Sequence, residues 1–140
     1  MTDVIELIEH DHREVEQLFA EFESTPQRAV ADRICEELDK HVAAEEAEVY
    51  PVVADEVSGG QKLAREAENE HKEAKQLIGR VRRTSDPDHL AELMTELKQA
   101  IQHHVQEEES EMLPKVRQEL PEAELEELGE RFGEAKQAAG

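Results

Sequence analysis

The feature that most constrains the fold of this chain is a helical segment that occurs twice. The first copy spans His41–Pro51 and the second spans His104–Pro114; the histidine, the valine after it, three glutamates and the proline coincide. A second repeated segment, His12–Phe19 and His71–Ile78, shares a histidine, a glutamate, a glutamine and a leucine. The chain is therefore predicted to contain two copies of one helix pair, related by pseudo-two-fold symmetry.

Apolar residues recur at three- and four-residue spacing over four long segments, which predicts four α-helices. We expect these helices at about residues 3–23, 26–57, 61–83 and 86–113. Asp3 and Glu6 have the spacing of a capping box at the first helix. Thr25–Pro26 and Asp86–Pro87 each predict an N-cap followed by a proline in the first helical turn.

Short connections between long helices predict an all-α chain that folds as an antiparallel up-down-up-down four-helix bundle. Only 3% of the residues are aromatic, so the composition also favours helices over strands. The 37% of charged residues raises the alternative of disorder, but the regular apolar spacing argues against it. Residues 1–120 are predicted to form the bundle, with a kink at Pro51. Residues 121–140 are predicted to add a short amphipathic C-terminal helix that opens at Pro121.

The net charge of −20 disfavours nucleic acid and anionic membrane surfaces as partners. No apolar run approaches the length of a membrane span, and the N-terminus lacks the basic and apolar parts of a signal peptide. The single cysteine, Cys35, has no partner for an internal disulfide and is expected to pack as a small apolar residue. These observations favour a cytoplasmic protein.

Four histidines and two glutamates occupy apolar stripes of the predicted helices. His12 and His71 take equivalent places on the first and third helices, and His41 and His104 do so on the second and fourth. One turn after these last two come Glu45 and Glu108. A buried carboxylate without a partner costs several kcal/mol, so this pattern predicts a multiply charged cation among the six side chains: His12, His41, Glu45, His71, His104 and Glu108.

The ligand types then indicate which metal binds. Four imidazoles and two carboxylates exceed what one tetrahedral zinc ion needs, whereas two ions bridged by Glu45 and Glu108 use every group. Each ion keeps positions for an oxo or hydroxo bridge and for an exogenous ligand. Imidazole and carboxylate ligands suit iron, which predicts two iron ions; manganese stays open.

The sequence resembles the hemerythrin family, specifically the bacterial hemerythrin-like (HHE cation-binding) proteins. The resemblance covers Asp3 to Pro114 and rests on Asp11–His12, Glu70–His71 and the two longer repeats. It implies a di-iron centre held by the six residues above, which binds O₂ or reacts with or senses O₂, peroxide, nitric oxide or iron. Ala67 stands where oxygen carriers have a further histidine, and Glu108 follows its histidine by four residues rather than five. These departures favour redox or peroxide chemistry over simple O₂ storage.

Several alternatives stay open at this stage. Glu9 and Glu68 precede His12 and His71 by three residues, which imitates a ferritin-like di-iron site but leaves His41 and His104 unexplained. The histidines off the stripes, His10, His89 and His103, are expected at the surface, and the run Glu107–Glu109 is expected to be mostly solvated.

Tyr50, the only tyrosine, pairs with Leu113 in the repeat. Ideal helix geometry turns Tyr50 away from His41 and favours a structural role. The alternative, in which Tyr50 contacts a metal or one of its ligands, requires Pro51 to alter that turn.

Two functional hypotheses follow. The first is a non-haem di-iron protein that binds or reacts with O₂, peroxide or nitric oxide, including catalase-like removal of peroxide. The second is a non-enzymatic sensor or iron-handling protein, in which metal occupancy changes the stability of the bundle. A bundle without metal is the third and least favoured reading.

Overall fold

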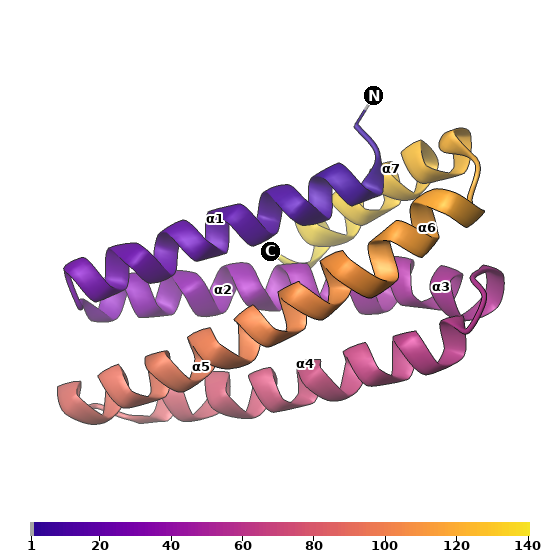
Figure 1. Cartoon of the computed structure of the whole chain (residues 1–140). Helices are drawn as coiled ribbons and strands as arrows, with labels where there is room; N and C mark the ends of the chain where they lie inside the picture. Colours follow the sequence, from indigo (N-terminus) through magenta and orange to yellow (C-terminus); the bar gives the residue numbers. More distant parts are fainter. Residues whose placement is uncertain (1) are drawn as a thin grey trace.

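The computed structural model describes residues 2–140, and all the regular elements in this range are helical. Four long helices lie side by side and alternate in direction (Figure 1). The first is α1 (Val4–Ser24) and the third is α4 (Gly60–Arg83). The second and fourth are each built in three pieces: α2 (Arg28–Ala44), η1 (Glu45–Val49) and α3 (Tyr50–Glu56), and then α5 (Pro87–Glu107), η2 (Glu108–Met112) and α6 (Leu113–Glu119). The predicted all-α, up-down-up-down bundle is confirmed.

A fifth helix, α7 (Glu122–Ala139), follows the bundle. It has 18 residues, compared with 21 in α1. It packs against α1, α2 and η1, so it covers one side of the bundle and leaves α4 without a covering helix (Figure 1). Its apolar residues Leu125, Leu128 and Phe132 are buried in the same cluster as Ile8 and Tyr50 of the bundle.

The helix ends follow local chemistry. Asp3 caps α1, where its Oδ1 accepts a hydrogen bond from the Glu6 amide at 2.9 Å. Asp86 caps α5 in the same way through the Asp88 amide. Gly59 precedes α4 with a φ of 67°, a left-handed conformation that only glycine adopts freely.

The start predicted for the second helix was wrong by two residues. The helix begins at Arg28 after Gln27, which makes no side-chain cap hydrogen bond. Thr25 is not available as its cap, because the Thr25 amide donates to the Glu21 carbonyl and closes α1. Gln27 is extended, and the chain reverses direction before Arg28.

The disturbance predicted at Pro51 is a π-helical turn. In η1 the Tyr50 amide donates to the carbonyl of Glu45, five residues back, and in η2 the Leu113 amide does the same to Glu108. A proline follows each turn, and a wider turn accommodates a residue that lacks an amide proton and crowds the carbonyl four residues back. Each π turn inserts one extra residue and rotates everything beyond it about the helix axis.

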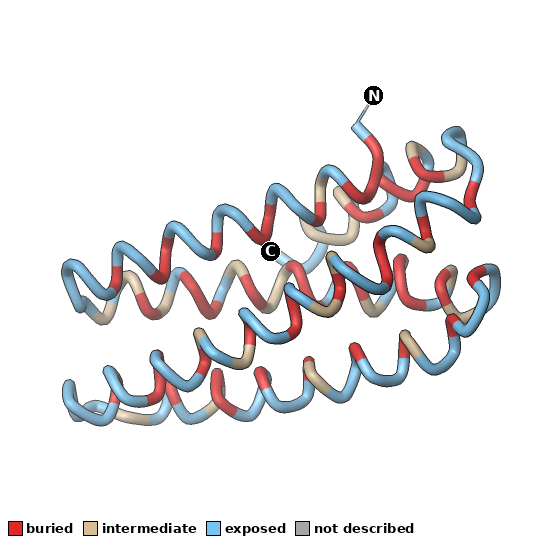
Figure 2. The backbone as a smooth tube through the Cα atoms, in the orientation of Figure 1, coloured by how far each residue is buried: buried red, intermediate tan, exposed pale blue. Residues whose placement is uncertain are grey.

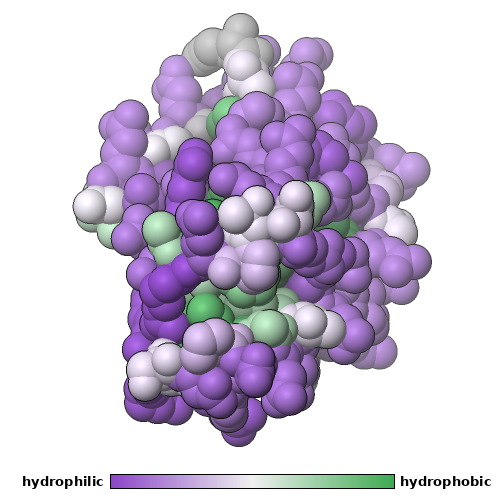
Figure 3. Space-filling view, turned by 90° about the vertical axis from the view of Figure 1, so that its left-hand side faces the viewer, coloured by the Kyte–Doolittle hydropathy of each residue, from purple (hydrophilic) through white to green (hydrophobic). Residues whose placement is uncertain are grey.

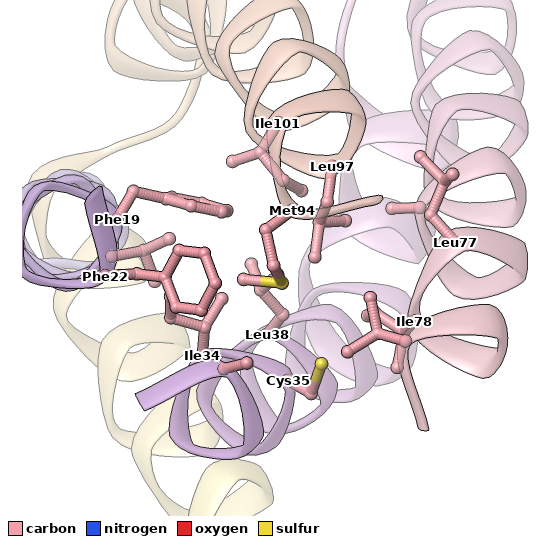
Figure 4. Close-up of a cluster of buried hydrophobic side chains, with 14 of the residues drawn as sticks. Phe19, Phe22, Ile34, Cys35, Leu38, Leu77, Ile78, Met94, Leu97 and Ile101 are labelled. Atoms are coloured by element: carbon pink, nitrogen blue, oxygen red, sulfur yellow. The ribbon is translucent and has the colours of Figure 1, made fainter. Parts of the chain in front are cut away.

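The buried side chains form two apolar clusters, one toward each end of the bundle. Figure 4 shows the cluster nearer the α1–α2 connection, where Phe19, Met94 and Leu97 point inward and Cys35 packs among them. Exposed residues lie along the outer faces of all helices (Figure 2). The surface at this end of the bundle is largely hydrophilic (Figure 3), which agrees with the net charge of −20. No helix in residues 2–140 is long and apolar enough to cross a membrane.

Candidate metal centre

The six residues singled out by the repeat come together inside the bundle. All are at least nine-tenths buried, with exposures from 0% for Glu45 to 6% for His41. Each imidazole turns its Nε2 atom toward the two carboxylates. The nearest Nε2–oxygen distances are 3.1 Å from His12 to Glu108 and 3.2 Å from both His41 and His71 to Glu45.

These ligand atoms fall into two groups that share Glu45. One group joins His12, His41, Glu45 and Glu108; the other joins His71 and His104 to Glu45. We refer to them as the His12–His41 half and the His71–His104 half. Two ligands about 2.1 Å from one ion and at right angles lie about 3 Å apart, which is the spacing seen here. Both carboxylates lie between the halves, because Glu108 turns Oε1 toward His12 and Oε2 toward His104 at 3.5 Å.

Several of these buried atoms lack the partners that a protein interior normally provides. Among residues 2–140 no hydrogen bond reaches His12 Nε2, His41 Nε2, Glu45 Oε2 or Glu108 Oε1. Unsatisfied polar atoms in a core are costly, and four of them facing one another could be satisfied by a bound cation. All four atoms belong to the His12–His41 half, so the donor set of that half fits a metal ion, whereas Nε2 of His71 and of His104 lies near the Tyr50 oxygen.

Every imidazole is held from behind by a carboxylate. The Nδ1 atoms of His12 and His41 lie 2.7 Å from Glu109 and Asp11. Those of His71 and His104 lie 2.8 Å from Glu46 and 2.7 Å from Glu70. These contacts fix the ring orientation and keep the proton on Nδ1, which leaves Nε2 free to bind a cation.

The carboxylates are anchored in turn. Lys136 of α7 donates to both oxygens of Asp11 at 2.7 and 2.8 Å, and Arg13 pairs with Glu109. Lys75 donates to Glu46 at 2.9 Å. Glu70 differs, because its outer neighbour is the imidazole of His103 at 3.3 Å.

These supporting carboxylates were missed, and the solvated character predicted for Glu109 was wrong. A signal for them exists in the sequence: each is adjacent to a proposed ligand, in the pairs Asp11–His12, Glu45–Glu46, Glu70–His71 and Glu108–Glu109. On a helix the neighbour of an inward residue points sideways, toward the next helix, where it can reach the back of another ligand.

The favoured reading of Tyr50, a purely structural role turned away from the centre, was also wrong. The side chain is 1% exposed, and its O–H donates to Glu108 Oε2 at 2.6 Å. The Tyr50 oxygen also lies 3.1 Å from Glu45 Oε1 and from His71 Nε2, and 3.4 Å from His104 Nε2. The extra residue of η1 causes this, because it brings Tyr50 one turn below Glu45 instead of onto the far face.

Two further predictions concern residues near the proposed ligands in the sequence. Glu9 and Glu68 are exposed, so the ferritin-like arrangement is wrong. His10, His89 and His103 are exposed as predicted.

The protein's own charges perturb the site strongly. Burial opposes protonation of His41, yet the charge of Glu45 and the hydrogen bond that His41 donates to Asp11 raise its pKa to about 10. Burial also raises the pKa of Glu45, but the neighbouring histidines outweigh it and hold that pKa well below the usual range. Burial and the carboxylates keep the pKa of Tyr50 well above its ordinary value. The arrangement is thus organised around positive charge at its centre.

Comparison with known proteins agrees with this geometry. The family model of the hemerythrin HHE cation binding domain matches residues 3–116. The chain belongs to the hemerythrin HHE cation-binding family. The two HHE repeats provide the paired histidines and glutamates described above.

A solved structure from the same family has the same architecture. The crystal structure of a hemerythrin HHE cation binding domain-containing protein from Mycobacterium kansasii superposes with a TM-score of 0.83 at 26% identity, covering 99% of this chain and 88% of that one. No curated protein matches the sequence. The similarity extends through α7, so the fifth helix belongs to the shared fold.

Proposed function

We propose that this HHE protein holds two iron ions on His12, His41, His71, His104, Glu45 and Glu108, and that the centre binds or reacts with O₂, peroxide or nitric oxide. The observation that carries the proposal is the set of four unpartnered buried atoms in the His12–His41 half, beside a second histidine pair that shares Glu45 with it. Imidazole and carboxylate ligands without a thiolate suit iron. Iron bound there supplies redox electrons and open coordination positions to a small ligand.

The protein's own residues orient the imidazoles, exclude water from the centre and provide the Tyr50 O–H as a proton donor. The four supporting carboxylates hold the imidazoles in one orientation, and the surrounding apolar cluster excludes water. The Tyr50 O–H is the protic group inside the centre, and it points at Glu108 Oε2. It lies beside the His71–His104 half, where it is placed to donate a proton to a small ligand or to bind a cation itself.

Metal analysis and reactivity test the proposal together. Purified protein loaded with iron is expected to hold about two ions per chain. Its absorption spectrum should change on addition of O₂, peroxide or nitric oxide, and gas evolution from peroxide would establish catalase-like activity. A single zinc ion, or no metal after loading with either iron or manganese, would contradict the two-metal centre. His89→Ala is the matched control, since His89 is exposed and remote from the centre.

The role of Tyr50 has its own test. If its oxygen binds ferric iron, the loaded protein has a visible phenolate charge-transfer band that Tyr50→Phe abolishes while two irons remain. Identical spectra of the two proteins would leave Tyr50 as a hydrogen-bond donor only. Leu113→Phe, at the equivalent position of the other repeat, controls for the change in packing.

A second candidate is a non-enzymatic sensor or iron-handling role. It is favoured by the fact that all four long helices contribute ligands, since metal binding then stabilises the whole bundle. A large rise in melting temperature on iron loading, with no turnover of peroxide or O₂, would support this role over the first.

A further inference from the structure

The two sides of the bundle give unequal access to the centre. On the α1–α2 side, α7 covers the ligands and places Phe132 edge-on against His41, with 5.6 Å between ring centroids. On the opposite side α4 and α5 lie together without a covering helix (Figure 1). The α4–α5 side is therefore a face from which a solute could approach the centre without displacing α7.

A small pocket opens on that side at Ala67. Its apolar wall is formed by Leu63, Ala67 and Met112, and its floor by the proposed ligands His104 and Glu108. The volume of about 20 Å³ is enough for one water-sized occupant. Glu108 is 3% exposed, and its Oε1 has no hydrogen-bond partner among the described residues. The pocket thus ends on a buried carboxylate of the centre, of which Oε2 accepts from Tyr50 and Oε1 lacks a hydrogen-bond donor within residues 2–140.

The mouth of this Ala67 pocket is acidic. Its rim carries four glutamates from two neighbouring helices: Glu66, Glu70, Glu107 and Glu111. Nearby positive charge is sparse: Lys62 lies 3.9 Å from Glu66 and is 80% exposed, which leaves it heavily screened. Carboxylates around a narrow mouth focus the field, raise the local concentration of cations and repel anions.

Two rim residues, Glu70 and Glu107, form a group of ligand type with the neighbouring His103. One atom each from Glu70, His103 and Glu107 lie within 4.8 Å of one another. His103 Nε2 is 3.3 Å from Glu70 and 3.2 Å from Glu107. Glu70 reaches inward at the same time, since its other oxygen contacts His104 Nδ1 at 2.7 Å. One side chain therefore connects the surface group to a proposed ligand of the centre.

We propose that the Ala67 pocket is the entry route for the divalent cations that load the centre, with Glu70, His103 and Glu107 as the first, transient binding site. This inference rests on the proposed two-metal function. A hard divalent cation exchanges part of its water for the rim carboxylates and then passes Ala67 to Glu108. Small neutral molecules such as O₂, nitric oxide and hydrogen peroxide are not repelled by the same mouth, whereas anions are.

The rate of metal loading tests the route. Metal-free protein is mixed with Co²⁺ under anaerobic conditions, and the absorption of the bound ion is followed by stopped flow. The variant E66Q/E107Q/E111Q should load roughly tenfold more slowly at low ionic strength. The difference should vanish in about 1 M salt, while the final stoichiometry and spectrum stay those of the wild type.

A matched variant separates local from global charge. The variant E21Q/E36Q/E92Q also removes three negative charges, but from exposed positions outside the pocket. It should bind Co²⁺ at nearly the wild-type rate. Equal rates for the two triple variants would overturn the route and leave the centre intact. Failure of the wild type to bind any Co²⁺, Fe²⁺ or Mn²⁺ would instead overturn the proposed function itself.

Ala67→Val tests passage through the pocket rather than attraction to its mouth. The two added methyl groups narrow the pocket whatever the ionic strength, so loading should remain slow in high salt. A wild-type rate in high salt would contradict passage at Ala67, provided that the variant melts as a folded protein.

Discussion

The His12–His41 and His71–His104 halves of the centre come from matching repeats, but their surroundings differ. The first half is closed by α7, which contributes Phe132 and Lys136. The second half has Tyr50 beside it and the Ala67 pocket in front of it. Duplication thus produces two equivalent sets of inner ligands. The halves become unequal through α7, which lies outside the repeat, and through Tyr50, which replaces a leucine within it. We expect the His12–His41 half to have mainly a structural role and exogenous ligands to bind at the more accessible His71–His104 half.

The largest effect on iron content is expected from a substitution of Glu45, which lies between the two halves. Glu45 Oε1 lies 3.2 Å from both His41 and His71 and 3.9 Å from His104. Glu45→Gln removes a charge that both ions share, so iron content should fall from about two per chain to below one. Atomic absorption measures the change, with the exposed Glu36→Gln as control. Retention of both irons would show that Glu45 does not bridge the halves.

The next largest effect is expected from a substitution that disturbs only the His12–His41 half, which α7 covers. Phe132 is 1% exposed and packs on His41, so Phe132→Ala should cost about 3–5 kcal/mol of unfolding free energy. It should also weaken binding of one of the two ions. Phe19→Ala creates a comparable cavity in the other apolar cluster and should destabilise the fold without this loss. Chemical denaturation and metal titration of both variants decide the point; equal metal affinities would exclude a role for α7 in shaping the centre.

The sequence predicts the fold and the six inward side chains better than it predicts the residues around them. The repeat and the apolar stripes predicted the bundle and placed six side chains in its interior, because helical periodicity alone decides which residues face inward. They did not predict the position of Tyr50, because a π turn changes the rotation per residue and leaves no mark in apolar spacing. A proline six residues after Glu45 and again after Glu108 was the available signal.

The covering helix shows a second limit. The spacing of Leu125, Leu128 and Phe132 predicted an amphipathic helix, but it contains no information on which side of a pseudo-symmetric bundle that helix covers. The contact between Lys136 and Asp11 joins residues far apart in the chain and depends on that choice. Long-range pairing of this kind is decided by packing, not by local pattern.

The pH dependence of the metal-free protein tests the closed half from another direction. The pKa of His41 is raised to about 10, chiefly by Glu45 and Asp11 against the opposing effect of burial. A histidine with a raised folded pKa stabilises fully below its unfolded value near 6.5 and loses that contribution as pH rises toward 10. Unfolding free energy should therefore fall by about 1.4 kcal/mol per pH unit for this proton. Iron-loaded protein should lack this slope, and His41→Gln should reduce it; an unchanged slope in the variant would contradict the assignment.

The smallest expected effect compares the outer anchors of the two halves. Lys136 holds Asp11 behind His41 and is 25% exposed, whereas Lys75 holds Glu46 behind His71 and is 49% exposed. Because solvent screens the second pair more, Lys136→Gln should weaken one metal site about tenfold and Lys75→Gln only about twofold. Competitive titration with a chelator resolves the two affinities. The reverse order would contradict the inference that the more buried anchor, Lys136 on α7, supports its metal site more strongly.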